Sequence, residues 1–425
     1  MQGAVLKTKE STVLTQDFYS QSLKIRKKYK IYLPPNYADA TKRYPVLYLF
    51  RGHENEWFDP YQDHSRGGQS VRQLADEMLA AGATGEMIIV GVSMTSDDGA
   101  VFGLGVNFLN AKLARKHSGV GTGKFENYFI HDLIAHIDKT YRTKTGRENR
   151  AADGFSLGGY TAIMLSIKHP RLFCSVGSYD GSHMFRDMDD PRHDHGGPDD
   201  FLWVRSDAMF APAFRRPRKR KYDVNYLLQY NPLNILETHS KSDKNLLRST
   251  RFYITCAAFD DSQGNRDRNV HLATLLQLHG IYNHAPSLIL SGDAHHNWKF
   301  ADLHLRETLK KHSEAFGLRR AKPRQSASPE YLPNVEIISV EDASHDHQPV
   351  KIRYRVYREV PVRVEILDFH GGLVTTLRFE VHTCGRHIVK WDGKNPQGYV
   401  VASGIYFVQI TTELGVLRQK FLFLR

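Results

Sequence analysis

The architecture of this chain is set by the stretch Arg150-Ala151-Ala152-Asp153-Gly154-Phe155-Ser156-Leu157-Gly158-Gly159-Tyr160. A short apolar run leads into the G-x-S-x-G sequence at 154–158, and an apolar helical pattern follows over 160–168 and ends before Pro170. A strand, this turn and a helix in that order are typical of a nucleophile elbow. The glycines are needed because the serine sits in a tight turn that leaves no room for neighbouring side chains.

This motif gives Ser156 a chemical role. The turn raises the hydroxyl above the sheet beside a helix N-terminus, where the backbone N–H of Leu157 can stabilise an oxyanion. A serine hydroxyl is a weak nucleophile until a base accepts its proton, and a carboxylate must orient that base. We therefore expect an acidic residue and then a histidine on loops after later strands.

Residues 1–318 alternate apolar strands with amphipathic helices around this motif. The pattern predicts an α/β-hydrolase fold with a mostly parallel central sheet. The expected strands are 44–50, 87–92, 150–152, 252–256 and 287–290, and the expected helices are 71–81, 129–141, 160–168, 269–279 and 298–312. A polar insertion at about 183–228 interrupts the pattern and is a candidate lid, since long irregular insertions are usually functional or disordered.

The loops after the last two expected strands supply candidates for the acid and the base. Asp260 and Asp261 follow one of them, and either could instead be a turn or helix-capping carboxylate. His295 and His296 follow the other, between a glycine turn and the start of a helix, and His296 is our choice as the base.

The loop after the first expected strand should complete the oxyanion site. A backbone N–H near His53 fits the role of second donor. Trp57 in the same loop and Phe155 beside the nucleophile are candidate pocket residues, although an aromatic side chain such as Trp57 could equally belong to the core.

The composition changes near residue 319. Residues 319–332 form a polar, proline-containing linker, which is typical of a domain boundary. From 333 to 425 short alternating strands are separated by turns such as Asp392-Gly393, and this pattern predicts an all-β sandwich.

Charge and composition limit the other function classes. The net charge of +12 comes from 58 basic and 46 acidic residues, with basic clusters at 24–30 and 215–221. We expect solvated surfaces there; a patch for nucleic acid or another polyanion is the alternative, and it predicts affinity that falls steeply with salt. The three cysteines predict neither a disulfide framework nor a zinc site, only free thiols in apolar segments.

We expect no metal, no cofactor and no membrane span. The His-Asp-His sequences at 193–195 and 345–347 bring ligand types together, but alternation in a loop does not build a closed site. Nucleotide-binding glycine motifs are missing from the sequence. No apolar run reaches the ~18 residues of a membrane span, and the first 15 residues lack an export signal, so the protein is expected in the cytoplasm as written, or outside the cell if a signal has been removed.

The catalytic half resembles the esterase family related to esterase D, which includes feruloyl esterases, acetylxylan esterases and S-formylglutathione hydrolase. The similarity rests on the stretches 32–37, 128–134, 154–160, His169-Pro170 and 292–298. It implies that the acid is Asp260, at the fifth position of the stretch that begins with Cys256, and that the base is His296, which precedes Asn297-Trp298. The loop that begins Arg51-Gly52-His53 is shorter and more polar than the family's glycine-rich oxyanion loop.

The tail resembles the Ig-like domain of the flagellar hook-capping protein and the sorting domains of type IX secretion. The similarity rests on 364–368, 390–394, Gly398 and 403–406. It implies an accessory domain for docking to protein or carbohydrate, for anchoring or for export. The whole chain is therefore expected to be a serine carboxylic-ester hydrolase acting on feruloyl or acetyl esters of plant polysaccharide, or on related aryl esters. The alternative is a hydrolase-fold binding or adhesion protein that docks through the sandwich.

Overall fold

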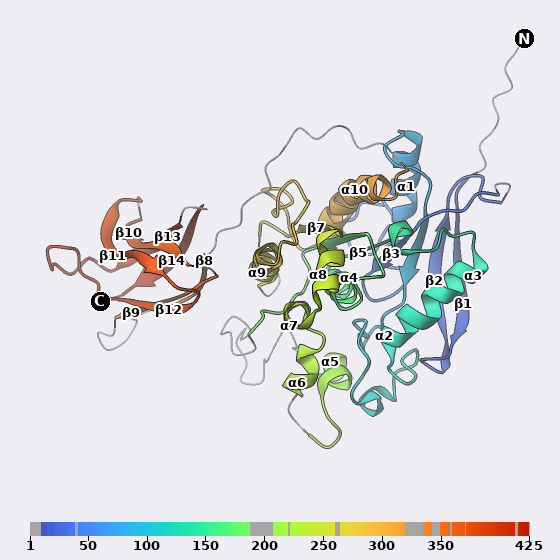
Figure 1. Cartoon of the computed structure of the whole chain (residues 1–425), viewed down its shortest axis with the longest axis horizontal. Helices are drawn as coiled ribbons and strands as arrows, with labels where there is room; N and C mark the ends of the chain where they lie inside the picture. The colour runs from blue at the N-terminus through green and yellow to red at the C-terminus, as the bar shows by residue number, and fades with distance from the viewer. Residues whose placement is uncertain are drawn as a thin grey trace, which may run out of the picture.

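Two parts of the chain have different architectures (Figure 1): a sheet covered by helices comes first, and a smaller all-β unit follows. The computed structural model describes residues 10–38, 41–187, 207–219, 222–259, 264–318, 335–341, 349–357, 359–369, 371–412 and 415–424.

Seven strands form the large sheet, in the order β1-β2-β4-β3-β5-β6-β7. They are β1 Thr12–Ser20, β2 Ile25–Leu33, β3 Val46–Phe50, β4 Ile88–Val92, β5 Arg150–Gly154, β6 Ser175–Tyr179 and β7 Arg251–Thr255. The strands from β4 to β7 in this order run parallel, and β1 and β2 pair antiparallel at one edge. The predicted α/β-hydrolase fold with a mostly parallel sheet is confirmed.

The core lies on both faces of this sheet. Val46, Tyr48 and Phe50 belong to one buried hydrophobic cluster, whereas Leu47 and Leu49 belong to another. Successive side chains of a strand point to opposite faces, so β3 separates the two clusters. This burial explains why β3 and β4 are continuous apolar runs in the sequence.

Helices cover both faces. They are α1 Val71–Ala80, α2 Phe125–Asn127, α3 Ile134–Thr140, α4 Leu157–Lys168, α5 Asp207–Phe214, α6 Val224–Leu228, α7 Pro232–Thr238, α8 Lys241–Arg248, α9 Asn265–Leu278 and α10 Trp298–Ala315. None of the helices in the described ranges has both the length and the apolar character that crossing a membrane requires.

The elements differ from the sequence expectation at several places, and β1, β6, α7 and α8 are not among the expected elements. The expected strand at 287–290 is only an isolated parallel bridge between Cys256 and Ile289. The expected helix at 129–141 begins as a π-helical segment, η2 Tyr128–Leu133, and continues as α3. The insertion at 183–228 contains α5 and α6, while 188–206 and 220–221 lie outside the described residues, so its role as a lid stays a prediction.

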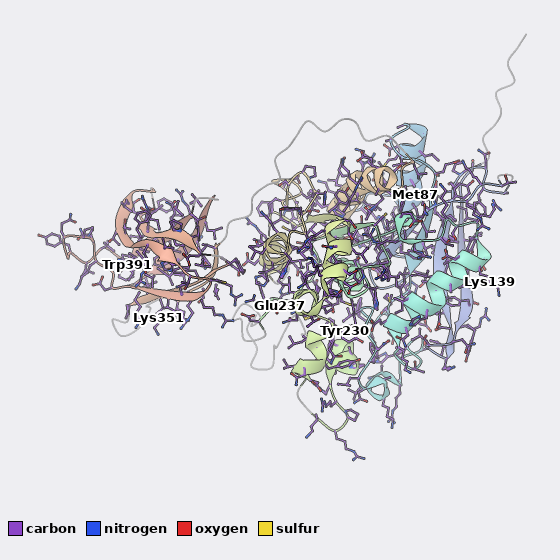
Figure 2. The ribbon with its side chains drawn as sticks, in the orientation of Figure 1. Met87, Lys139, Tyr230, Glu237, Lys351 and Trp391 are labelled. Carbon is purple, nitrogen blue, oxygen red and sulfur yellow. The ribbon has the colours of Figure 1, made fainter. Side chains whose placement is uncertain are left out.

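The C-terminal unit is a β-sandwich. One sheet has the order β11-β10-β13-β14 and the other β12-β9-β8. The strands are β8 Val335–Glu341, β9 Val350–Val356, β10 Val360–Leu367, β11 Leu373–His382, β12 Gly385–Trp391, β13 Gly404–Thr412 and β14 Gly415–Phe423. Trp391, labelled in Figure 2, is buried in the core of this unit.

Buried polar contacts join the sandwich to the α/β part. The imidazole of His271 in α9 lies 3.1 Å from the carboxylate of Glu336 in β8 and 2.9 Å from the hydroxyl of Tyr357. Arg355 of β9 pairs with Asp187, which lies between β6 and β7 in the chain. These contacts place the sandwich against α9 in this structure.

Candidate active site

Ser156 occupies a strained turn between β5 and α4. Its backbone has φ 59° and ψ −121°, in a region that residues with a side chain rarely adopt. A Cβ atom on Gly154 would lie 2.3 Å from the backbone of Gly158, and one on Gly158 would lie 2.0 Å from the carbonyl oxygen of Phe50. Both glycines are therefore required by close approach of the backbone, as a nucleophile elbow demands.

The turn after β6 lies directly against this elbow. The N–H of Ser156 donates to the carbonyl of Tyr179 at 3.1 Å, and the N–H of Ser182 donates to the carbonyl of Ser156 at 3.1 Å. The hydroxyl oxygens of Ser156 and Ser182 are 3.5 Å apart. Leu157 provides the first N–H of α4, a position where no preceding helical turn offers an acceptor, which suits an oxyanion donor.

His296, in the loop before α10, packs beside the nucleophile elbow. Its ring centroid lies 4.7 Å from that of Phe155, the residue before the nucleophile. Its Nδ1 lies 2.5 Å from Oδ2 of Asp180, while its side chain keeps 15% of its surface exposed. A carboxylate at Nδ1 favours the tautomer with its proton there, which leaves Nε2 as the proton acceptor.

The acid that the family resemblance implies, Asp260, stays a prediction. Asp260 and Asp261 are outside the described residues. Asp180, which directly follows β6, holds the carboxylate that meets His296, and we did not expect it there. The available signal was the Asp-Gly pair at 180–181, but such a pair is also an ordinary turn sequence.

The expected second oxyanion donor, the N–H of His53, has a partner within its own loop. The N–H of His53 donates to Oε1 of Glu56 at 2.6 Å, and the N–H of Gly52 donates to the same oxygen at 3.0 Å. Oε2 of Glu56 lies 3.7 Å from Nε of Arg51. In this structure the N–H of His53 is thus engaged by a carboxylate of its own loop and is not open to an oxyanion.

The two candidate pocket aromatics are both buried, which for Trp57 is the core alternative left open by the sequence. Trp57 is 1% exposed and Phe155 is 2% exposed. The indole N–H of Trp57 donates to the carbonyl of Phe50 at 3.0 Å, and its ring meets Trp298 edge-on at 5.0 Å. Both residues belong to the packed support of the site instead of lining it, because their rings fill the core beneath the loop of His296.

A second His–Asp cluster lies buried below the elbow. Asp153 in β5 is within 3.1 Å of Nε2 of both His304 and His312 of α10, and it accepts a hydrogen bond from Thr308 at 2.5 Å. Burial by itself would raise the pKa of this carboxyl, but the two imidazoles hold it well below its usual range. The cluster joins the strand of the nucleophile to α10.

The predictions for the two basic clusters and the cysteines agree with the structure only in part. The cluster at 24–30 is not wholly solvated, since Lys27 is 1% exposed and its ammonium donates to the carbonyls of Thr95 and Gly119. In the other cluster Arg216 pairs with Asp223. Of the three free cysteines, Cys256 is buried as expected, but Cys384 is exposed.

Within the described ranges no group of His, Cys, Asp or Glu side chains could hold a metal ion. The two His-Asp-His sequences, at 193–195 and 345–347, lie outside those ranges.

The two parts of the chain match the models of different families. Residues 20–229 match the family described as putative esterase, and residues 339–415 match the FlgD Ig-like domain. The two resemblances inferred from the sequence are thereby confirmed.

Curated relatives share only a segment with this chain. An endo-1,4-beta-xylanase/feruloyl esterase of Xylanibacter ruminicola is 30% identical over 184 residues, which cover 41% of this chain and 22% of that protein. An esterase of Mycobacterium tuberculosis is 30% identical over 156 residues, which cover 37% of this chain and 29% of that protein. The chain therefore spans less than a third of the length of either relative.

A solved structure of a ferulic acid esterase shares the fold. It matches 72% of this chain and 99% of its own chain, with a TM-score of 0.52 and 20% sequence identity. The α/β-hydrolase architecture is shown by this match.

Proposed function

We propose that this chain is a serine carboxylic-ester hydrolase that acts through an acyl-enzyme. The observation that carries the proposal is an imidazole, His296, whose Nδ1 faces a buried carboxylate and whose ring centroid lies 4.7 Å from that of Phe155, the residue before the strained serine turn. The match to the esterase family over residues 20–229 supports the same reaction class.

Each step of the reaction uses a group at this site. The hydroxyl of Ser156 attacks the ester carbonyl carbon while Nε2 of His296 accepts its proton. The N–H of Leu157 stabilises the negative oxygen of the tetrahedral intermediate. The intermediate then collapses, His296 protonates the departing alcohol, and an ester bond to Ser156 remains. Water, deprotonated by His296, hydrolyses that ester and releases the acid.

For the substrate we propose feruloyl or acetyl esters of plant polysaccharide, or related aryl esters. This narrower assignment is supported by the names of the relatives, one of which combines a xylanase with a feruloyl esterase. It gains no support from Trp57 or Phe155, since both rings are buried. We propose that the sandwich is an accessory docking domain, in line with its match to the FlgD Ig-like family.

The experiment that tests the reaction class compares two neighbouring serines. Ser156→Ala should abolish hydrolysis of a nitrophenyl acetate and labelling by a fluorophosphonate probe. Ser182→Ala is the matched control, because its hydroxyl lies only 3.5 Å from that of Ser156. Loss of labelling in Ser182→Ala together with normal turnover in Ser156→Ala would refute the assignment. Feruloyl, acetyl-xylan and simple aryl esters then give the substrate preference.

A further inference from the structure

We propose that Asp180 is the carboxylate that positions the catalytic imidazole of His296, an inference that rests on the proposed esterase reaction. Family resemblance points instead to Asp260, after β7. In an α/β sheet the carboxyl ends of parallel strands meet at one edge, so an acid after β6 can serve a histidine there as well as one after β7 can.

The carboxylate of Asp180 is held at both oxygens. Oδ2 lies 2.5 Å from Nδ1 of His296, and Oδ1 accepts a hydrogen bond from the N–H of Ala257 at 3.2 Å. The side chain of Asp180 is 3% exposed. A buried carboxylate is costly unless it is paired, so this contact favours a proton on Nδ1 and stabilises the imidazolium that forms during catalysis.

The backbone fixes the position of this carboxylate. Asp180 has φ +44°, a conformation that aspartate tolerates better than most residues, and its N–H donates to the carbonyl of Thr255 at 2.7 Å. A Cβ atom on Gly181 would lie 2.3 Å from Nε2 of His183 and 2.7 Å from Oγ of Ser178, so a larger residue there would have to displace these buried side chains.

The turn that bears the acid is hydrogen-bonded to the turn that bears the nucleophile. Residues 179 and 182 flank Asp180, and both bond to the backbone of Ser156 at 3.1 Å. Ser156 and Asp180 are two of the few non-glycine residues with positive φ in the described ranges, and their turns touch. Strained backbone of this kind clusters where geometry is part of a mechanism.

The test compares Asp180→Asn with Asp260→Asn. Asparagine at 180 is nearly isosteric and can still accept from Ala257, but it cannot stabilise an imidazolium. We expect Asp180→Asn to lower kcat by about 10³–10⁴-fold with little change in KM, as loss of such a carboxylate does in serine hydrolases. Its activity should also shift along the pH axis, and Asp180→Glu should restore part of it. Asp260→Asn should stay within tenfold of the wild type.

A second measurement does not depend on turnover. A hydrogen bond between an imidazole N–H and a buried carboxylate gives a strongly downfield proton resonance. We expect this signal in the wild type and in Asp260→Asn, and its loss in Asp180→Asn and His296→Ala.

The proposal would be overturned if the downfield resonance and the turnover survived in Asp180→Asn but were lost in Asp260→Asn. The esterase assignment would still stand in that case, since it depends on Ser156→Ala.

Discussion

Alanine at position 158 should damage the site more than its size suggests. The added Cβ atom would lie 2.0 Å from the carbonyl oxygen of Phe50, 2.3 Å from its carbonyl carbon and 2.7 Å from Cα of Arg51. All three are backbone atoms at the end of β3, so no side-chain rotation can relieve the contact. Ordinary contacts begin at 3.4 Å, and α4 must therefore move away from β3 by more than an ångström.

This displacement carries the oxyanion donor with it, because α4 begins at Leu157. A misplacement of about 1 Å can cost about 10²-fold in rate. Overpacking of this kind typically costs about 1–3 kcal/mol of stability. We therefore expect Gly158→Ala to lower kcat/KM for an aryl ester at least 100-fold, and to lower the free energy of unfolding by about 1–3 kcal/mol.

The assay pairs ester hydrolysis with urea unfolding followed by circular dichroism. Gly292→Ala is the control, since a Cβ atom there meets nothing within 4 Å although the loop leads to His296. Activity of Gly158→Ala within tenfold of the wild type, with unchanged stability, would refute the packing argument.

Two predictions concern buried charges. Burial lowers the pKa of Lys27 to about 8, from an ordinary value of 10.5. The folded pKa of Lys27 lies below the unfolded one. The wild type should therefore gain roughly 3 kcal/mol of stability relative to Lys27→Met as the pH rises through this interval. An equal difference in the free energy of unfolding between the two proteins at pH 7.5 and at pH 10.5 would contradict this.

Asp153→Asn removes the charge that faces two buried imidazoles and should cost about 3 kcal/mol at pH 7. The pKa of Asp153 lies well below its ordinary value of 3.8, so the stabilisation is complete above that pH and is lost as the pH falls further. The variant should therefore show a weaker acid dependence in urea titrations between about pH 5 and 2.

Sequence patterns predicted the features that depend on residues adjacent in the sequence. The turn around Ser156 was predictable because its glycines and its flanking strand and helix are adjacent in the sequence. His296 was predictable because a glycine turn and a helix start bracket it. Asp180 was not, since only the packing of β6 beside β5 brings it to an imidazole 116 residues away. The hydrogen bond from the N–H of His53 to Glu56 was not predictable either, because no sequence pattern shows where the side chain of Glu56 turns.

Burial separates the two His–Asp clusters of this chain into different roles. Asp153 and the side chains of His304 and His312 are at most 1% exposed, so a substrate cannot reach them, and a proton lost there has no path to an ester. Asp180 is equally buried, but the imidazole it meets retains an exposed part. The same pair of residue types therefore serves stability in one place and proton transfer in the other. Asp153→Asn should accordingly reduce the free energy of unfolding with a modest loss of kcat. Asp180→Asn should instead cause a large loss of kcat with a modest loss of stability.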